Sequence, residues 1–377
     1  MSGSMNIRPD RLYRLLSDII NIYSPSGKEG ELVSYLEGYA HSAGLPLIRQ
    51  NVEEERDNLL YLPDEEYPQV LFTGHIDTVP PFDYENYKFY DENGEISGLG
   101  AADMKGGCAA LIEAFLSFRE IYGPRIPAAL ALVVGEEETG DGILRLLEDY
   151  HFTWALVGEP TDLQPCPIHY GYMEVQLSTS GKRVHASMAN SEHNAIRDML
   201  RLLMRIAEHL DSRGDIIFNI RDVNSSYAGF AVPDRCEARV DIHFPPQYPV
   251  GELTVELDEL ISQNLTGKLK LEDILMYSLI HPGYQLPEKG FLPDTIKRIY
   301  RRRKMSWNPG AFRSDSDANL LWMAGVKPVI LGPGQLSKAH TQDESISFQQ
   351  VITASEIYFD LLGALTPQSK TRKARRG

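Results

Sequence analysis

Cysteine is scarce in this chain of 377 residues. The three cysteines, Cys108, Cys166 and Cys236, lie far apart, and no Cys-x-x-Cys pair occurs. This pattern argues against a disulfide framework and against a thiolate zinc site. A reducing compartment suits such a chain best, so we expect a cytoplasmic protein.

Long apolar runs and positive charge are also lacking. No segment approaches the roughly 18 apolar residues of a membrane-spanning helix, so we expect no membrane partner. The 37 Lys and Arg against 53 Asp and Glu leave a formal net charge of −16, which argues against nucleic-acid binding because phosphate contacts require the opposite sign. Two basic segments run against this trend: residues 297–304, interpreted as the solvated face of a helix, and a basic tail over residues 369–377.

Motifs of three other enzyme classes are missing too. The sequence contains neither a Gly-x-Ser-x-Gly nucleophile elbow nor a Gly-x-x-x-x-Gly-Lys phosphate loop. The pair Gly98-x-Gly100 is too short for a dinucleotide-binding fingerprint. The site chemistry must therefore be sought in other residues.

Buried strands alternate with helices over residues 5–169. The apolar segments Val70–Phe72, Ala128–Val134 and Trp154–Val157 are typical of strands buried on both faces, and segments with helical apolar spacing lie between them. This alternation predicts an α/β domain with a doubly wound, mostly parallel sheet.

The pattern changes over residues 170–282. Alternating strands and amphipathic helices follow the order strand–helix–strand–strand–helix–strand, which predicts a smaller α+β domain with its helices on one face, as in ferredoxin-like folds. The α/β pattern returns over residues 283–368. We therefore expect one domain, made of residues 5–169 and 283–368, to be interrupted by an inserted domain over residues 170–282.

Acidic and imidazole side chains follow the predicted strands of the first domain. They are His75, Asp103, the cluster Glu136–Glu138, Glu159 and His340. Because the ends of parallel strands meet at one edge of a sheet, we expect these side chains to gather there. Burying so many carboxylates is unfavourable unless cations compensate them. Two histidines with three or four carboxylates suit a pair of divalent ions roughly 3.5–4 Å apart that share a carboxylate bridge.

The motifs and their order resemble the M20 family of metallopeptidases and amidohydrolases, which includes acetylornithine deacetylase, succinyl-diaminopimelate desuccinylase and aminoacylase. The matching motifs are Gly74–Pro80, Gly100–Gly107, Gly135–Glu137, Val157–Thr161 and Ala339–Thr341. The resemblance implies a zinc-exopeptidase-like catalytic domain with an inserted lid and dimerisation domain. It also implies a homodimer.

By this resemblance, two metal ions are bound: His75 and Glu159 hold one, Glu137 and His340 hold the other, and Asp103 bridges them. Zinc is the expected metal, with cobalt or manganese as substitutes, because oxygen-rich ligands discriminate poorly among these ions. The family's bridging Asp commonly precedes a cis peptide bond, which is therefore implied between Asp103 and Met104.

The resemblance makes Glu136 the general base. Asp77 is expected to accept the other ring N–H of His75 and fix its tautomer, with a plain turn cap as the alternative. The register of the acidic cluster stays open. Aligning Gly142 with the family's later glycine makes Glu136 the base and Glu137 the ligand, whereas a shift by one residue gives Glu137 and Glu138.

Three further residues are matched to substrate contacts. His185, in the segment Lys182–Ser187, matches the family's small-domain histidine, which reaches the partner's site in dimeric members and is a candidate oxyanion donor. Asn194 binds substrate or caps the following helix. Arg313 is a candidate carboxylate clamp, with an exposed loop arginine as the alternative.

The leading functional hypothesis is a di-zinc amidohydrolase that removes an acetyl or succinyl group from an N-acyl amino acid. Glu159 favours it, because the family's deacylases tend to carry Glu at this ligand and its peptidases Asp. A dipeptidase or exopeptidase acting on short peptides is the alternative, favoured by Ser316–Asn319 and Leu331-Gly332. A non-catalytic metal-binding relative is a third hypothesis, which the intact Glu136 disfavours.

Overall fold

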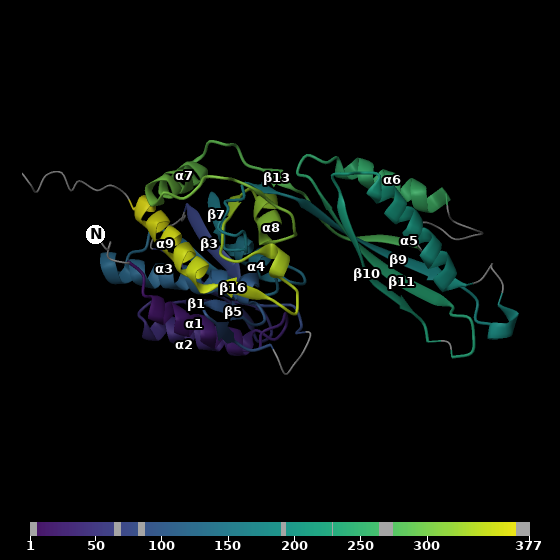
Figure 1. The fold of residues 1–377 in the computed structure, drawn as a ribbon, viewed down its shortest axis with the longest axis horizontal. Coiled ribbons are helices and arrows are strands. Elements are labelled where there is room, and N and C mark those ends of the chain that lie inside the picture. The colour runs from purple at the N-terminus through teal and green to yellow at the C-terminus, as the bar shows by residue number, and fades with distance from the viewer. Residues whose placement is uncertain are drawn as a thin grey trace, which may run out of the picture. The chain divides into compact units, whose positions relative to one another are not determined.

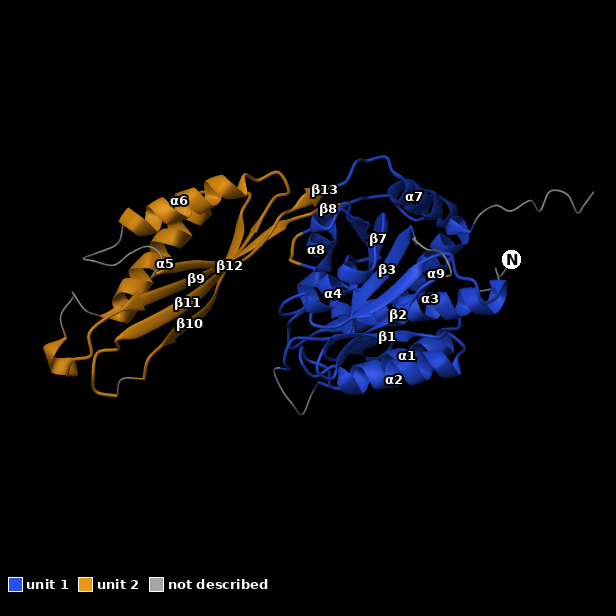
Figure 2. Ribbon diagram, turned by 180° about the vertical axis from the view of Figure 1, so that it is seen from behind, with its two compact units in different colours: residues 1–167, 286–312, 316–377 blue, residues 168–285, 313–315 orange. Residues whose placement is uncertain are grey.

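The computed structural model describes residues 6–63, 69–81, 87–189, 194–227, 229–263 and 274–366. It divides into two compact units (Figures 1 and 2). Unit 1 comprises Met1–Pro167, Leu286–Phe312 and Ser316–Gly377, and unit 2 comprises Ile168–Gln285 and Arg313–Asp315. Unit 2 covers the predicted insert over residues 170–282, and it also includes the short segment Arg313–Asp315. The tail over residues 369–377 lies outside the described residues.

Within the described residues, unit 1 is built around a six-stranded sheet of order β1-β2-β6-β3-β7-β15. The strands are β1 (Ile48–Glu53), β2 (Arg56–Tyr61), β3 (Val70–His75), β6 (Ala129–Val133), β7 (Trp154–Val157) and β15 (Lys327–Ile330). The last four run parallel, and β2 and β1 extend the sheet in antiparallel pairs. Strands β3, β6 and β7 are buried along their whole length, as predicted for a sheet covered on both faces.

Two groups of helices pack on this sheet. The helices of unit 1 are α1 (Pro9–Asn21), α2 (Gly30–Ser42), α3 (Gly106–Tyr122), α4 (Asp141–Asp149), α7 (Phe291–Arg303), α8 (Asp317–Met323) and α9 (Phe348–Leu365). Helices α3 and α9 place Phe115 and Tyr358 against Phe72 of β3, while α4 and α8 contact each other and the sheet. The predicted α/β fold is confirmed. None of the helices in the described ranges is long and apolar enough to cross a membrane.

Unit 2 contains an antiparallel sheet of order β10-β11-β9-β12 in its described part. In chain order its elements are β9 (Gly171–Ser180), α5 (Ala195–Asp211), β10 (Ile217–Ser225), β11 (Arg235–Phe244), α6 (Val250–Gln263) and β12 (Leu275–His281). Both helices lie on one face of the sheet (Figure 2), where Val175 and Val240 pack against Met199 and Leu257. This is the predicted ferredoxin-like arrangement.

A buried histidine lies in the short strand β8 (Ile168–His169) of unit 2, which pairs with β13 (Tyr284–Gln285). The ring of His169 stacks on Tyr284 with centroids 5.4 Å apart. Its Nδ1 lies 2.6 Å from the carbonyl oxygen of Tyr170, to which it donates. Because His169 is fully buried, loss of solvation disfavours its charged form and lowers its pKa to about 4.

This histidine should make folding stability depend on pH. The unfolded chain takes up a proton on His169 near its ordinary pKa, whereas the folded state takes it up only near pH 4, so the stability is complete above about pH 6.5 and is lost as the pH falls. We expect a loss of about 2 kcal/mol between pH 7.5 and 5. In urea unfolding of the metal-free proteins, this contribution should appear as the difference between the pH profiles of wild type and His169→Phe, because the other titrating groups are common to both.

The control is His41→Phe, which changes an exposed histidine of α2 and should keep the wild-type pH profile. An unchanged profile in His169→Phe would contradict the prediction.

Candidate metal centre

The structure gathers the predicted acidic and imidazole residues at the carboxyl ends of the parallel strands. His75 ends β3, the acidic cluster follows β6 and Glu159 follows β7. Among the described residues, three overlapping sets each offer ligand atoms within 4.8 Å of one another. These sets are His75, Asp103 and Glu159; His75, Glu136 and Glu137; and Asp103, Glu137 and His340. Since the sets share members, they form one continuous cluster, called here the ligand cluster.

Asp103 lies between the two histidines. Its Oδ1 is 3.3 Å from Nε2 of His75, and its Oδ2 is 3.4 Å from Nε2 of His340. On the first side, Oε1 of Glu159 is 3.6 Å from Nε2 of His75. On the second side, Oε2 of Glu137 is 3.0 Å from Nε2 of His340. The Asp103–Met104 peptide bond is cis, as the family resemblance predicted.

The charges in the cluster are strongly perturbed. Burial raises the pKa of Glu136 and of Glu159 well above the ordinary value, and neighbouring carboxylates add to the shift. Burial lowers the pKa of His75, but the carboxylates of Glu136 and Glu159 outweigh this and hold it well above its usual range. Burial also opposes protonation of His340, yet Glu137 and Asp103 raise its pKa to about 9.

These residues fit a divalent cation. Oε1 of Glu159 is buried and, among the described residues, receives no hydrogen bond. An ion would satisfy that oxygen and take over the charge compensation that protons otherwise supply. Imidazole and carboxylate groups are the ligands expected for zinc and similar metals.

Asp77 connects two parts of the cluster. Nδ1 of His75 is 3.1 Å from the backbone carbonyl of Asp77 and 3.5 Å from its carboxylate, so the carbonyl is the closer acceptor. The carboxylate accepts from Oγ of Ser26 and from the backbone N–H groups of Glu136 and Glu137. Burial raises the pKa of Asp77, but its hydrogen bonds with His75 and Ser26 leave it lowered overall. Asp77 therefore also anchors the acidic cluster, which the sequence did not predict.

Two glycines allow close backbone contact with Gly158, the residue before Glu159. A Cβ atom on Gly107 would lie 2.2 Å from the carbonyl oxygen of Gly158, and one on Gly332 would lie 2.1 Å from the same atom. Any side chain at either position would displace the segment that carries Glu159.

Two buried charged residues beside the cluster were missed by sequence reasoning. Glu344 accepts hydrogen bonds from backbone N–H groups in the Asp103 segment. Lys105 donates from Nζ to the carbonyl oxygen of Ile22 at 2.9 Å, and burial lowers its pKa to about 7. The available signal was proximity in sequence: Lys105 lies within the Gly100–Gly107 motif, and Glu344 follows His340 by four residues.

The remaining candidates make their described contacts within unit 2. His185 is exposed, with Nδ1 2.8 Å from Oγ of Ser187. Oδ1 of Asn194 accepts from the backbone N–H of Arg197 and caps α5, the alternative weighed for it. The exposed guanidinium of Arg313 lies 5.7 Å from the ring centroid of Tyr170.

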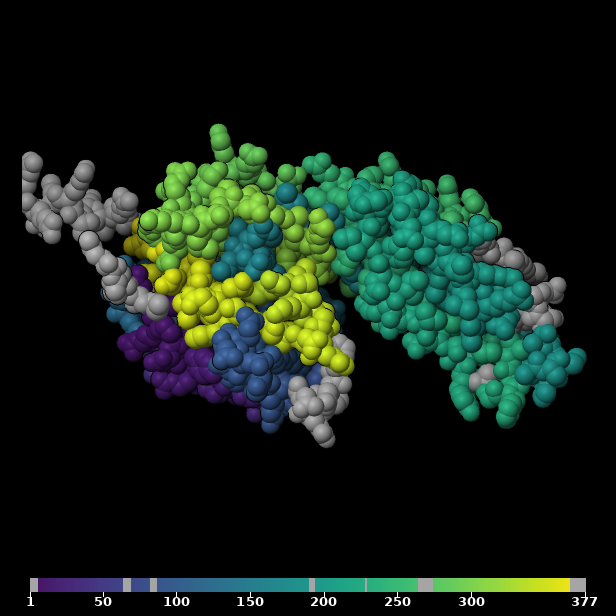
Figure 3. Space-filling model, in the orientation of Figure 1, coloured from purple at the N-terminus to yellow at the C-terminus, as the bar shows by residue number. Residues whose placement is uncertain are grey.

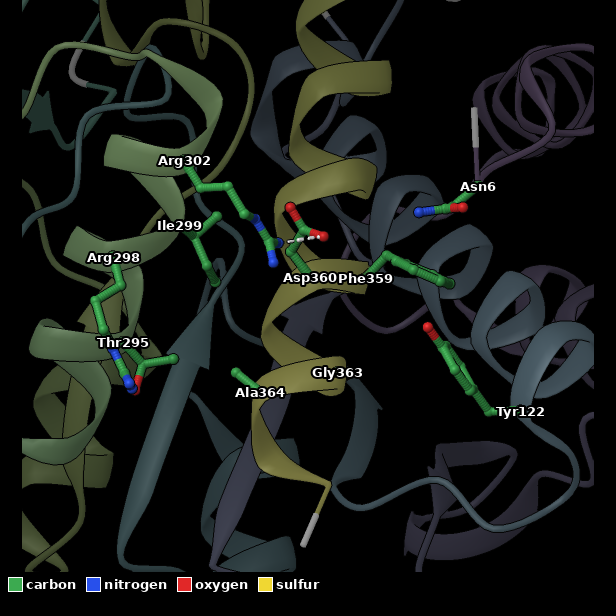
Figure 4. A pocket seen from close by; sticks show the side chains of 10 residues that line it. All are labelled: Asn6, Tyr122, Thr295, Arg298, Ile299, Arg302, Phe359, Asp360, Gly363 and Ala364. Carbon is green, nitrogen blue, oxygen red and sulfur yellow. Dashed lines mark hydrogen bonds and ion pairs between the residues drawn. The ribbon is translucent and has the colours of Figure 1, made fainter. Parts of the chain in front are cut away.

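A separate hollow of about 620 Å³ lies in unit 1 and is lined by residues of α7, α9 and the end of α3 (Figure 4). On one side, Arg302 of α7 pairs with Asp360 of α9 at 2.6 Å; Tyr122 and Phe359 lie on the other. Lys297, Arg298 and Arg302 are exposed, as predicted for the basic segment over residues 297–304. None of the lining residues belongs to the ligand cluster, so the hollow is not where the cluster's chemistry takes place.

An α/β unit with an imidazole–carboxylate cluster at its strand ends, joined to a ferredoxin-like unit, is the arrangement of a metal-dependent hydrolase. The chain belongs to peptidase family M20/M25/M40, which it matches over residues 71–364.

Relatives and solved structures agree with this assignment. The chain is 32% identical to a probable carboxypeptidase of Aspergillus fumigatus, over 93% of this chain and 86% of that protein. It is 27% identical to an acetylornithine deacetylase of Proteus mirabilis, over 93% and 95%. A tripeptidase structure from Staphylococcus aureus superposes with a TM-score of 0.75 at 20% identity, covering 95% of this chain and 99% of that one.

Proposed function

We propose that this hydrolase binds two zinc ions and cleaves the amide bond of an N-acyl amino acid, with acetyl or succinyl as the acyl group. The observation that supports two ions is Asp103, whose two carboxylate oxygens face two different histidines. Glu159, rather than Asp, at the ligand position favours deacylation over peptide cleavage.

Each residue of the cluster has a proposed role. One ion is held by His75 and Glu159, the other by Glu137 and His340, and Asp103 is shared. When bound, the ions lower the pKa of a water and polarise the amide carbonyl.

Glu136 takes the proton of the attacking water and delivers it to the leaving amine. Its Oε2 is 3.7 Å from Nε2 of His75, and it shares one of the three ligand sets with His75 and Glu137. Glu138, the partner in the alternative register, is exposed and belongs to none of the three ligand sets found in the described residues.

The second candidate function is a dipeptidase or exopeptidase of the same family. A relative named as a probable carboxypeptidase and a neighbour named as a tripeptidase favour it. Both candidates use the same site and differ in the substrate's acyl side.

A substrate panel decides between the two candidates. Enzyme supplied with zinc, cobalt or manganese is assayed against N-acetyl and N-succinyl amino acids and against dipeptides. We expect turnover of an acyl amino acid, two metal equivalents by elemental analysis, and loss of activity after chelation that added metal restores. Cleavage of dipeptides without turnover of any acyl amino acid would select the second function.

We further propose a homodimer formed through unit 2, in which His185 serves the partner's site. Strand β10 is at an edge of the described sheet, and its Ile220 and Val223 are exposed together with Leu200 and Met204 of the neighbouring α5. Exposed apolar groups beside an unpaired edge are typical of association surfaces.

Mixing two inactive variants tests this arrangement. His185→Ala and Glu136→Gln, unfolded and refolded together, should recover about a quarter of wild-type activity, because half of the dimers are mixed and each mixed dimer has one complete site. An inactive mixture, or a monomer by light scattering, would overturn the proposal.

A further inference from the structure

Two segments far apart in the chain lie side by side next to the ligand cluster. Strand β5 (Glu95–Ser97) leads into the segment that carries Asp103, and strand β16 (Ser345–Ser347) follows the segment that carries His340. The two strands pair antiparallel, with Ile346 opposite Ile96. Figure 3 shows the same adjacency at the surface, where yellow C-terminal atoms lie against blue atoms of this region.

Glu344 immediately precedes β16, and its side chain reaches the segment that follows β5. One carboxylate oxygen accepts from the backbone N–H of Gly100 at 3.0 Å. The other accepts from Ala102 at 2.9 Å and from Asp103 at 3.0 Å. The side chain is buried, with 5% of the residue exposed. Hydrogen bonds to an ionised acceptor in a buried place are among the strongest in proteins.

Burial raises the pKa of this carboxylate to about 7, and the hydrogen bonds from the three backbone N–H groups offset part of that shift. Lys105 is 2% exposed. Burial lowers the pKa of this lysine, and the nearby charge of Glu344 acts in the opposite direction. A Cβ atom on Gly100 would lie 3.2 Å from Cδ of Lys105, so the lysine side chain packs directly on the segment that Glu344 holds.

We propose that Glu344 is a positioning residue, whose carboxylate ties the Asp103 segment to the His340 segment and so sets the geometry of the ion that these two ligands share. The inference rests on the proposed two-ion function and deepens it. An amide at this position offers one acceptor oxygen instead of two, and its NH2 group would face a backbone N–H. The two segments would then lose their common anchor although every ligand remained.

The test is Glu344→Gln, with Asp343→Asn as the matched control. Asp343 is the preceding residue, is exposed, and loses the same charge. Each full-length protein is stripped of metal and titrated with Co²⁺, with binding followed by calorimetry and by the visible spectrum of the bound cobalt. Wild type and Asp343→Asn should bind two equivalents. Glu344→Gln should keep the first step and bind the second equivalent about 10–100-fold more weakly.

The outcomes separate this inference from the proposed function. Two ions in the wild type with an unchanged second step in Glu344→Gln would overturn the inference alone, as would an equal weakening of both steps. A single ion in the wild type would overturn the two-ion function and the inference with it. If Glu344→Gln shows no cooperative thermal unfolding, the same cobalt titration is made on Glu344→Asp. This variant keeps the negative charge but has a shorter side chain. A wild-type second step in folded Glu344→Asp would overturn the inference.

Discussion

Glu136→Gln should lower kcat by about 10²–10⁴-fold, the usual contribution of a general base, while leaving the bound metal in place. The side chain keeps its shape but can no longer accept a proton from water or return one to the amine. Because Glu136 is proposed to act on protons and not on metal, its loss should appear in turnover and not in metal content. Steady-state kinetics and elemental analysis of the same preparation measure both.

Glu138→Gln makes the same exchange two residues away, at an exposed carboxylate, and should be close to wild type. Glu137→Gln should lose metal, because its carboxylate is 3.0 Å from Nε2 of His340. Normal activity in Glu136→Gln would overturn the assignment of the base. Retained metal with lost turnover in Glu137→Gln, together with metal loss in Glu138→Gln, would select the register shifted by one residue.

Asp103→Asn should have the largest effect of any single change in the cluster. The two carboxylate oxygens of Asp103 lie 3.3 Å and 3.4 Å from the two histidines, so an amide removes an anionic ligand from both proposed ions at once. We expect fewer than two bound ions and a loss of kcat/KM beyond the 10²–10⁴-fold expected for a missing base. Metal content and kcat/KM, measured over a range of added zinc, test this.

Asp343→Asn serves as the control here too, because it removes one exposed carboxylate and should keep both ions. A folded Asp103→Asn enzyme that retained two ions and near wild-type kcat/KM would show that Asp103 is not a shared ligand.

The sequence contained enough information for the fold and for the membership of the ligand cluster. Fully apolar segments such as Trp154–Val157 are typical of buried strands, and parallel strands bring their ends to one edge. His75 and Glu159 could therefore be placed together although 84 positions separate them. The alternation over residues 170–282 likewise predicted the ferredoxin-like unit, because a strand with one buried face repeats every two residues.

Only the tertiary structure decided how the cluster is held. It showed that the carboxylate of Asp77 binds the backbone of Glu136 and Glu137, while the carbonyl of Asp77 is the closer acceptor for His75. It also showed Glu344 on the backbone of residues 100–103, and Arg313–Asp315 in unit 2. Hydrophobic periodicity is a local property that each segment carries by itself. A hydrogen bond between a side chain and a distant backbone N–H leaves no such pattern, because any carboxylate can make it once packing has brought the two segments together.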